Sequence, residues 1–217
     1  MKIGFSTGCF WKNVNPVSKK AIELCNFEEC NCIEICAARL DRVTFLRDLS
    51  KEDFQDFDFV SLHLPCDVRY YNHEVCEKLF SEIMSAHKNI GFDVIVLHPD
   101  LVDDWEYMRK FDLPLAIENM DASKPFGKSV DNLLKFSKGF RFVLDINHAF
   151  SNDSSGELAK NLHETFRDTL CEFHLSGLNP EGRGHCPLYS AKQGKFINYI
   201  QSGNPVIIES ALIYVIM

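Results

Sequence analysis

The chain alternates short apolar runs with longer amphipathic segments. Eight runs have the length and composition of buried strands, and they cover residues 2–6, 32–36, 59–65, 93–100, 113–121, 141–145, 171–177 and 205–210. Segments with helical periodicity follow most of them, at residues 16–27 (with Pro16 in the first turn), 72–90, 102–110, 130–137, 156–168 and 192–201. This alternation predicts an α/β chain folded as a (β/α)₈ TIM barrel. An open doubly wound sheet is disfavoured because neither GxGxxG nor a P-loop is present.

The sequence stops soon after the eighth predicted strand. Only residues 211–217 follow that strand, where a full outer helix normally completes such a barrel. We therefore expect residues 1–217 to form a single, shortened barrel domain whose last outer helix is missing or rudimentary. Residues 211–216 are expected to cover the gap or to form a contact in a homo-oligomer, and a frayed end is the alternative.

Groups that can bind metal ions follow the predicted strands. The carboxyl ends of parallel barrel strands meet at one mouth, so these side chains are expected to converge there. Each one alone could be a hydrogen-bonded structural residue, and a carboxylate such as Glu34, on the face opposite Ile33 and Ile35, could simply form a salt bridge with a loop. Together they favour a divalent metal such as zinc, manganese or cobalt. The candidates are His63, His98, Glu118, Asp145, His148, His174, His185 and Glu209.

Composition narrows the classes of partner. Lys and Arg number 23 against 31 Asp and Glu, and the net charge of -8 disfavours a polyanionic partner. The apolar runs are too short for a membrane span and no signal peptide is recognisable, so a cytoplasmic protein is expected. Nine cysteines are present. The group Cys25, Cys30, Cys32 and Cys36 lacks paired CxxC spacing, and buried free thiols are favoured over a metal site there.

Seven motifs spread over the chain resemble those of the xylose isomerase-like barrel superfamily. That group includes sugar-phosphate isomerases and epimerases and the endonuclease IV type of abasic-site nuclease. The resemblance runs from the first strand to the last, and the LDxxHA element is its most specific part. The motifs are SLHLP, VLHPD, AIENMD, LDINHA, FHLSG, GHCPL and VIIES.

Resemblance to the ketose epimerases implies one divalent ion held by Glu118, Asp145, His174 and Glu209, with His148 beside the substrate. The ion would acidify a C–H bond next to a carbonyl and stabilise the enediolate. Glu118 and Glu209 would act as general base and acid. The epimerases also carry an Arg after the seventh strand, for which Arg183 is the candidate. Phe10 and Trp11 could stack on a sugar face or form a hydrophobic lid.

Resemblance to endonuclease IV implies up to three zinc ions instead. His63, His98 and a bridging Glu118 would hold the first, and the four residues of the epimerase pattern would hold the second. His148 and His185 would hold the third together with an Asp two residues before His185, but Arg183 occupies that position. Lys12, Lys124 and Arg183 could meet a phosphate, and a nucleic-acid substrate is disfavoured but stays open.

These observations lead us to expect a metal-dependent isomerase or epimerase of a small sugar or sugar phosphate. An abasic-site phosphodiesterase is the second expectation. A barrel that binds a metal or ligand without turnover is the third.

Overall fold

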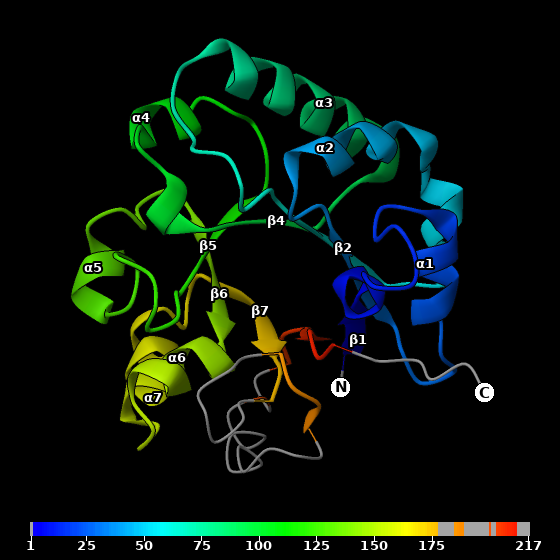
Figure 1. The fold of residues 1–217 in the computed structure, drawn as a ribbon. Coiled ribbons are helices and arrows are strands. Elements are labelled where there is room, and N and C mark those ends of the chain that lie inside the picture. Colours follow the sequence, from blue (N-terminus) through cyan, green and yellow to red (C-terminus); the bar gives the residue numbers. More distant parts are fainter. Residues whose placement is uncertain (1, 178–184, 189–199, 201–202, 212–217) are drawn as a thin grey trace.

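Eight parallel strands form a closed barrel in the order of the sequence (Figure 1). The computed structural model describes residues 2–177, 185–188, 200 and 203–211. The predicted (β/α)₈ barrel is therefore confirmed. The strands are β1 (Ile3–Ser6), β2 (Cys32–Cys36), β3 (Phe59–His63), β4 (Val94–Leu97), β5 (Leu115–Glu118), β6 (Arg141–Asp145), β7 (Leu170–Leu175) and β8 (Val206–Ile208).

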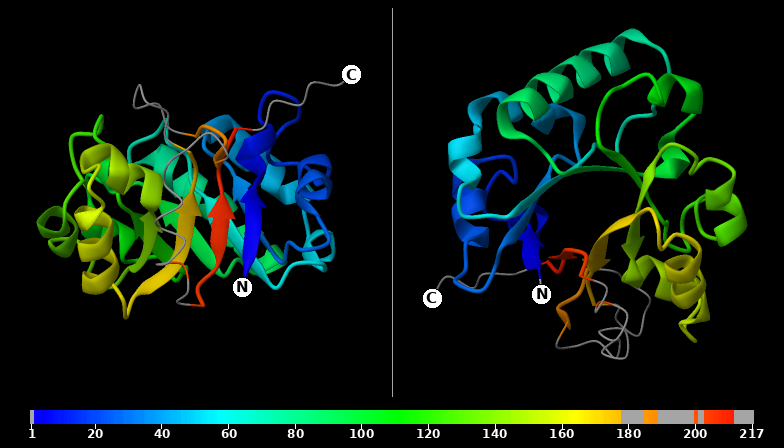
Figure 2. Two further views of the ribbon diagram at one scale, coloured as in Figure 1. Left: turned by 90° about the horizontal axis from the view of Figure 1, so that it is seen from below. Right: turned by 180° about the vertical axis from the view of Figure 1, so that it is seen from behind.

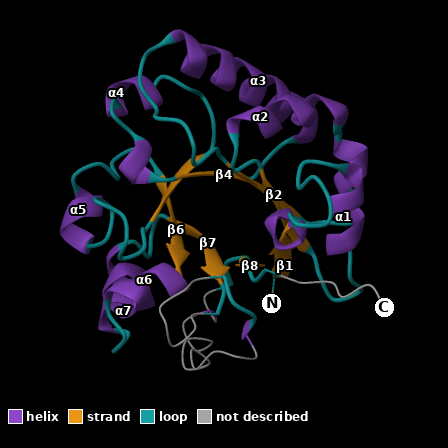
Figure 3. Cartoon of the chain, viewed as in Figure 1, coloured by secondary structure: helices purple, strands orange, loops and turns teal. Residues whose placement is uncertain are grey.

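Helices lie outside the ring of strands (Figure 3). They are α1 (Lys19–Cys25), α2 (Leu40–Val43), α3 (Glu74–Ile90), α4 (Trp105–Met108), α5 (Val130–Leu134), α6 (Ile146–Asn152) and α7 (Glu157–Thr165). Short 3₁₀ turns occur at Thr7–Phe10, Thr44–Asp48, Lys51–Phe54 and Pro99–Leu101. Helices α2 and α6 were not predicted. The helix predicted at 192–201 and residues 212–217 of the C-terminal segment lie outside the described residues, Ile200 excepted.

The first helix begins later than the sequence predicts. Pro16 does not lie in its first turn, because Ser18 is the N-cap and its hydroxyl accepts a hydrogen bond from the Ala21 amide (3.2 Å). A serine cap of this kind satisfies one of the free amides at a helix start. The proline therefore belongs to the preceding loop, and the prediction of its position was wrong.

Side chains alternate between the outside and the inside of the barrel along each strand. Outward residues such as Ile33, Ile35 and Ile117 pack with helix residues in the large apolar core. Inward residues form layers, and the lower layer is a separate apolar cluster. Above it, successive inward positions are polar and end at the mouth. The lower cluster consists of Cys32, Phe59, Val94, Val96, Ala116, Val143, Cys171 and Ile207.

The barrel closes where β1 pairs with both β2 and β8, as the strands in the left view of Figure 2 show. Gly4 lies at this closure, paired with Cys32 on one side and Ile207 on the other. A Cβ atom at Gly4 would come within 1.7 Å of the Cys32 carbonyl oxygen. Only glycine therefore permits this close approach of the strands.

The cysteines and the helices bear on two further expectations. All nine cysteines are free thiols. Among the helices of the described residues, none is long and apolar enough to cross a membrane.

Candidate metal centre

A cavity of about 330 Å³ opens at the carboxyl ends of the strands. Its walls come from the ends of the eight strands and from the loops that follow them. Pockets that bind one small molecule have volumes from roughly 300 to 1,000 Å³. The cavity is therefore at the lower end of this range. Among its lining residues are Trp11, His63, His98, Glu118, Lys124, His148 and Glu209.

Four predicted ligands meet at the base of this cavity. One donor atom from each of Glu118, Asp145, His174 and Glu209 lies within 4.8 Å of the other three. Strand register explains the meeting, because Asp145 on β6 pairs directly with His174 on β7, and Glu118 ends the adjoining strand β5. We call these four residues the quartet. The sequence predicted all four members.

Glu118 lies at the centre of the contacts among these residues. Its Oε1 atom lies 3.1 Å from His174 Nδ1 and 3.5 Å from His148 Nδ1. Its Oε2 atom lies 3.1 Å from His98 Nε2 and 3.5 Å from His63 Nε2. One buried carboxylate thus contacts four imidazoles, which come from β3, β7, the residue after β4 and helix α6.

Two oxygens of the quartet lack hydrogen-bond partners. Glu118 Oε2 and Asp145 Oδ2 are buried and accept no hydrogen bond from any described residue. Both histidine contacts to Glu118 Oε2 lack hydrogen-bond geometry, although they are short. Buried carboxylate oxygens are rarely left without a partner. The three carboxylates and the one imidazole of the quartet form a donor set that fits a divalent ion.

The buried charged groups of the site strongly shift one another's pKa values. Burial by itself would raise the pKa of the Glu118 carboxyl, but His174, His63 and His98 hold it well below its usual range. Burial would lower the pKa of His174, yet Glu209, Glu34 and Glu118 raise it well above its usual value. Burial raises the pKa of Glu209 to about 7. Without a metal the site is thus a carboxylate–imidazolium cluster, and an ion must displace a proton from His174 to bind.

Asp145 also starts helix α6. Its Oδ1 atom accepts a hydrogen bond from the His148 amide (2.7 Å), which makes Asp145 the N-cap. Asn119 hydrogen-bonds both backbone groups of Asp145 at 2.8 Å. His148 therefore belongs to a helix and not to a strand end as predicted. Its Nδ1–H donates to the Asn119 carbonyl (2.8 Å), and the residue lines the cavity.

A second layer of acidic groups lies below the quartet. Glu34 is completely buried, and its Oε2 atom lies 3.2 Å from His174 Nε2. Glu172 lies 3.7 Å from the same nitrogen and accepts a hydrogen bond from Ser61 (2.7 Å). The alternative of a salt bridge between Glu34 and a loop is therefore not what the structure shows. The alternation of Glu34 with Ile33 and Ile35 was the available signal, because the face opposite the helices of a barrel strand is the barrel interior.

The sequence also gave no reason to select Cys66, which follows β3 by three residues. Its Sγ atom lies 3.8 Å from His98 Nε2 and 4.0 Å from His63 Nδ1. Burial would raise the pKa of this thiol, but His98 and His63 outweigh burial and lower it to about 6. The predicted residues His63 and His98 thus come together with a thiol that favours its charged form.

The remaining predicted residues are more scattered. His185 is half exposed, has a φ of 57°, and hydrogen-bonds the Glu209 carbonyl through Nδ1 (3.1 Å). Trp11 lines the cavity with 53% of its surface exposed, whereas Phe10 is fully buried in the core and cannot stack on a ligand. Lys124 also lines the cavity. Arg183 lies outside the described residues.

Three solved structures resemble this fold. The D-allulose 3-epimerase from Methylomonas sp. matches with a TM-score of 0.63 and 16% identity over 97% of this chain and 84% of its own. The crystal structure of AsfvAP:AG matches with a TM-score of 0.58 and 14% identity over 84% of this chain and 79% of its own. SacUVDE matches with a TM-score of 0.54 and 17% identity over 84% and 75%.

No family model matches the sequence, and no curated protein matches it. At these identities the three likenesses concern the fold alone. This chain shares its barrel fold with them, in agreement with the (β/α)₈ barrel that the sequence predicts.

Proposed function

We propose that this chain is a divalent-metal-dependent isomerase or epimerase that acts on a small sugar or sugar phosphate through an enediolate. The placement of two carboxylates carries the proposal. Glu118 Oε1 and Glu209 Oε2 approach the same atom, His174 Nδ1, at 3.1 and 3.6 Å. They come from β5 and from the residue after β8. Two carboxylates that face one point from different strands can exchange protons with a bound substrate from two sides.

The quartet would hold the ion, which would stabilise negative charge on the oxygens of a hydroxyketone. Glu118, an ionised carboxylate, then removes the proton from the carbon next to the carbonyl, and the electron pair of that C–H bond forms the enediolate. Glu209, whose pKa of about 7 allows it to carry a proton, returns a proton to the same carbon from the other side, which inverts its configuration. His148, held by its bond to Asn119, contacts a substrate hydroxyl. Exchange of protons with water then returns both carboxyl groups to their starting states.

The surroundings of the quartet suit a small polar substrate. A cavity of about 330 Å³ has room for one small molecule. Trp11 offers an aromatic face for the apolar side of a sugar ring. Lys124 gives the cavity a positive charge that can meet a phosphate. The similarity to a D-allulose 3-epimerase, which covers 97% of this chain, supports the same class of substrate.

Solvent deuterium exchange tests this proposal. The full chain, loaded with Mn²⁺ or Co²⁺, is incubated in D₂O with a panel of ketopentoses, ketohexoses and their phosphates, and NMR follows the carbon next to the carbonyl. We expect deuterium at that carbon of at least one sugar and formation of its epimer or isomer. Glu118→Gln and Glu209→Gln should each abolish product formation, whereas Glu74→Gln, an exposed residue paired with Lys78, should not.

Failure of exchange across the panel with metal-loaded protein would contradict the proposal. Retention of a bound ion without any exchange would instead support a barrel that binds metal without turnover.

A zinc-dependent phosphodiesterase of abasic-site DNA is the second candidate. The observation that favours it is the approach of His63 and His98 to Glu118, because that carboxylate could bridge two ions. The likeness to AsfvAP, an AP endonuclease, and to SacUVDE points the same way. Against it, the net charge of -8 repels a duplex, and Arg183 replaces the Asp of the third zinc site.

Incision of an abasic-site duplex decides between the two candidates. Zinc-replete protein that cuts such a duplex, and loses this activity with a chelator, would establish the nuclease. Intact duplex together with sugar exchange would exclude it.

A further inference from the structure

A layer of polar side chains lies inside the barrel, deeper than the quartet. Its two carboxylates are Glu34 on β2 and Glu172 on β7, and both are completely buried. Its two hydroxyls belong to Ser6 on β1 and Ser61 on β3, which pair in register with Glu34 from either side. We call these four residues the inner layer. The proposed sugar chemistry gives none of them contact with the substrate.

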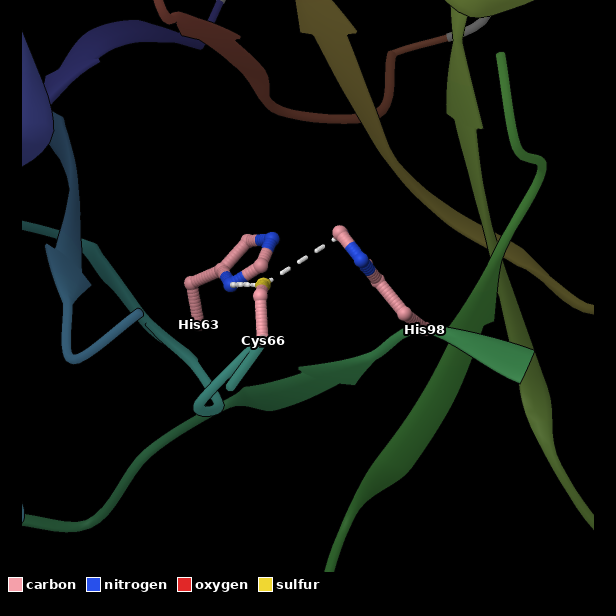
Figure 4. A group of neighbouring side chains, drawn as sticks. All are labelled: His63, Cys66 and His98. Atoms are coloured by element: carbon pink, nitrogen blue, oxygen red, sulfur yellow. Dashed lines mark hydrogen bonds between the residues drawn. The ribbon is translucent and has the colours of Figure 1, made fainter. Parts of the chain in front are cut away.

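Strand β3 shows the depth of the inner layer. Residues two apart on a strand face the same side of a sheet. Phe59 belongs to the lower apolar cluster, Ser61 to the inner layer, and His63 ends the strand at the cavity wall (Figure 4). The inner layer therefore lies one level below the cavity. Ser6, which also lines the cavity, connects the two levels.

Three carboxylate oxygens of the inner layer lack hydrogen-bond partners. Both oxygens of Glu34 and the Oε2 atom of Glu172 accept no hydrogen bond from any residue that the structure describes. Glu172 Oε1 accepts one from Ser61 (2.7 Å). Neither carboxylate pairs with a lysine or an arginine among the described residues. Buried carboxylates without compensating charge are costly, so this layer calls for a positive group.

His174 alone cannot compensate both carboxylates. Its Nε2 atom lies 3.2 Å from Glu34 Oε2 and 3.7 Å from Glu172 Oε1, and one N–H group can serve only one of them. One donor atom from each of these three residues lies within 4.8 Å of the other two. A cation with bonds of about 2.0 to 2.6 Å to oxygen joins donor atoms that are roughly 3 to 5 Å apart. The spacing of the two carboxylates therefore fits an ion.

We propose that Glu34 and Glu172 bind a hard divalent cation such as Mg²⁺ inside the barrel, below the quartet. Carboxylate oxygens suit magnesium and calcium, and magnesium is commonly held by one or two carboxylates. The ion engages Glu34 Oε1 and Glu172 Oε2, the oxygens that no described residue contacts through a hydrogen bond. Glu34 keeps its contact with His174 through Oε2. Neither carboxylate belongs to the quartet, and the inference does not depend on the proposed sugar chemistry.

Zinc at the quartet allows the two sites to be tested separately. The full chain is first loaded with one equivalent of Zn²⁺ and then brought to equilibrium by dialysis against Mg²⁺ or, in a separate experiment, Ca²⁺. Plasma mass spectrometry counts the ions bound per chain. We expect one equivalent of Mg²⁺ or Ca²⁺ in addition to the zinc. Glu172→Gln should lose this ion and keep the zinc, whereas Glu164→Gln, an exposed residue of α7, should keep both.

Two further variants separate the inner site from the quartet and from a folding defect. Asp145→Asn should lose the zinc but keep the Mg²⁺ or Ca²⁺, because Asp145 belongs to the quartet. Ser61→Ala removes the hydrogen bond to Glu172 and should weaken binding of the inner ion about 10- to 100-fold, as loss of a partner behind a metal ligand does. Circular dichroism confirms that each variant is folded before dialysis.

The outcomes for the two sites can be told apart. Zinc without Mg²⁺ or Ca²⁺ in the unsubstituted protein would overturn the inference and leave the proposed function standing, and the two carboxylates would then share a proton. Mg²⁺ or Ca²⁺ without zinc would support the inner site and contradict metal binding at the quartet. Full retention of Mg²⁺ or Ca²⁺ in Glu172→Gln would place the ion elsewhere and would also overturn the inference.

Discussion

Glu34 Oε2 lies 3.2 Å from Nε2 of His174, while Nδ1 of the same ring lies 3.1 Å from Glu118 Oε1. The imidazole is thus held between two buried carboxylates that contact its two nitrogens. A carboxylate behind a metal-binding histidine fixes the orientation of the ring and makes it a more basic ligand. For an ion bound at the quartet, Glu34 would therefore be a positioning residue that acts through His174 from below the cavity.

Replacing Glu34 tests this relationship. Glu34→Gln should weaken Mn²⁺ binding about 10- to 100-fold, the range measured for such outer partners of metal ligands. Isothermal titration on the metal-free protein measures the change. Glu23→Gln, an exposed residue that pairs with Lys20, is the matched control and should bind Mn²⁺ as tightly as the unsubstituted chain. Unchanged Mn²⁺ affinity in Glu34→Gln would show that Glu34 does not support the site.

Trp11 is predicted to bind substrate. Trp11→Ala should raise KM about 2- to 12-fold with little change in kcat, since aromatic contacts of this kind contribute about 0.5 to 1.5 kcal/mol. Steady-state kinetics on the best sugar of the panel measures both constants. Phe45→Ala removes an aromatic side chain that is 44% exposed and does not line the cavity. An equal effect of the two substitutions would mean that Trp11 acts only through stability.

Lys124 is predicted to distinguish phosphorylated from free sugars. Lys124→Met removes the positive charge at the cavity and should raise KM for a sugar phosphate about 10-fold, which is about 1.4 kcal/mol. The KM for the corresponding free sugar should not change. Lys128→Met, at a lysine outside the cavity lining, should leave both constants unchanged. Equal losses for both sugars in Lys124→Met would exclude a phosphate contact.

Metal removal should destabilise the fold. An ion that binds only the folded chain stabilises it by about 2.7 kcal/mol at 100 times its Kd. For a chain of this size, that free energy corresponds to a rise in Tm of roughly 5 to 10 °C. Scanning calorimetry of chelator-treated and Mn²⁺-loaded protein measures the difference. Asp145→Asn should show a smaller rise, and an identical Tm with and without metal would argue against binding at the quartet.

The sequence predicted the barrel and most of its mouth, because both depend on local patterns. Strand β5 is an apolar run that ends in Glu118, and parallel strands bring such ends together whatever the details of packing. The quartet follows from this rule and from the motifs that resemble those of the xylose isomerase-like barrels. The start of α1 was missed because Pro16 is favourable in a first turn, whereas the capping bond of Ser18 decides where the helix begins.

Glu34 and Cys66 could not be assigned from the sequence for different reasons. The role of Glu34 depends on its meeting with His174, 140 residues later in the chain and on the seventh strand, and no local pattern encodes that contact. The position of Cys66 beside His98 depends on the path of a loop, which turns its thiol toward that ring. In the sequence, nothing in its spacing distinguishes Cys66 from the other eight cysteines.

Binding of divalent metal at the strand ends underlies the proposed activity. Plasma mass spectrometry on protein purified without chelator or nickel resin, for the unsubstituted chain and for Asp145→Asn, measures it directly. We predict one divalent ion per chain at the quartet, and loss of that ion in Asp145→Asn. No bound ion in the unsubstituted protein, even after reloading with zinc, manganese and cobalt, would mean that the cluster of imidazoles and carboxylates is structural and would contradict the account.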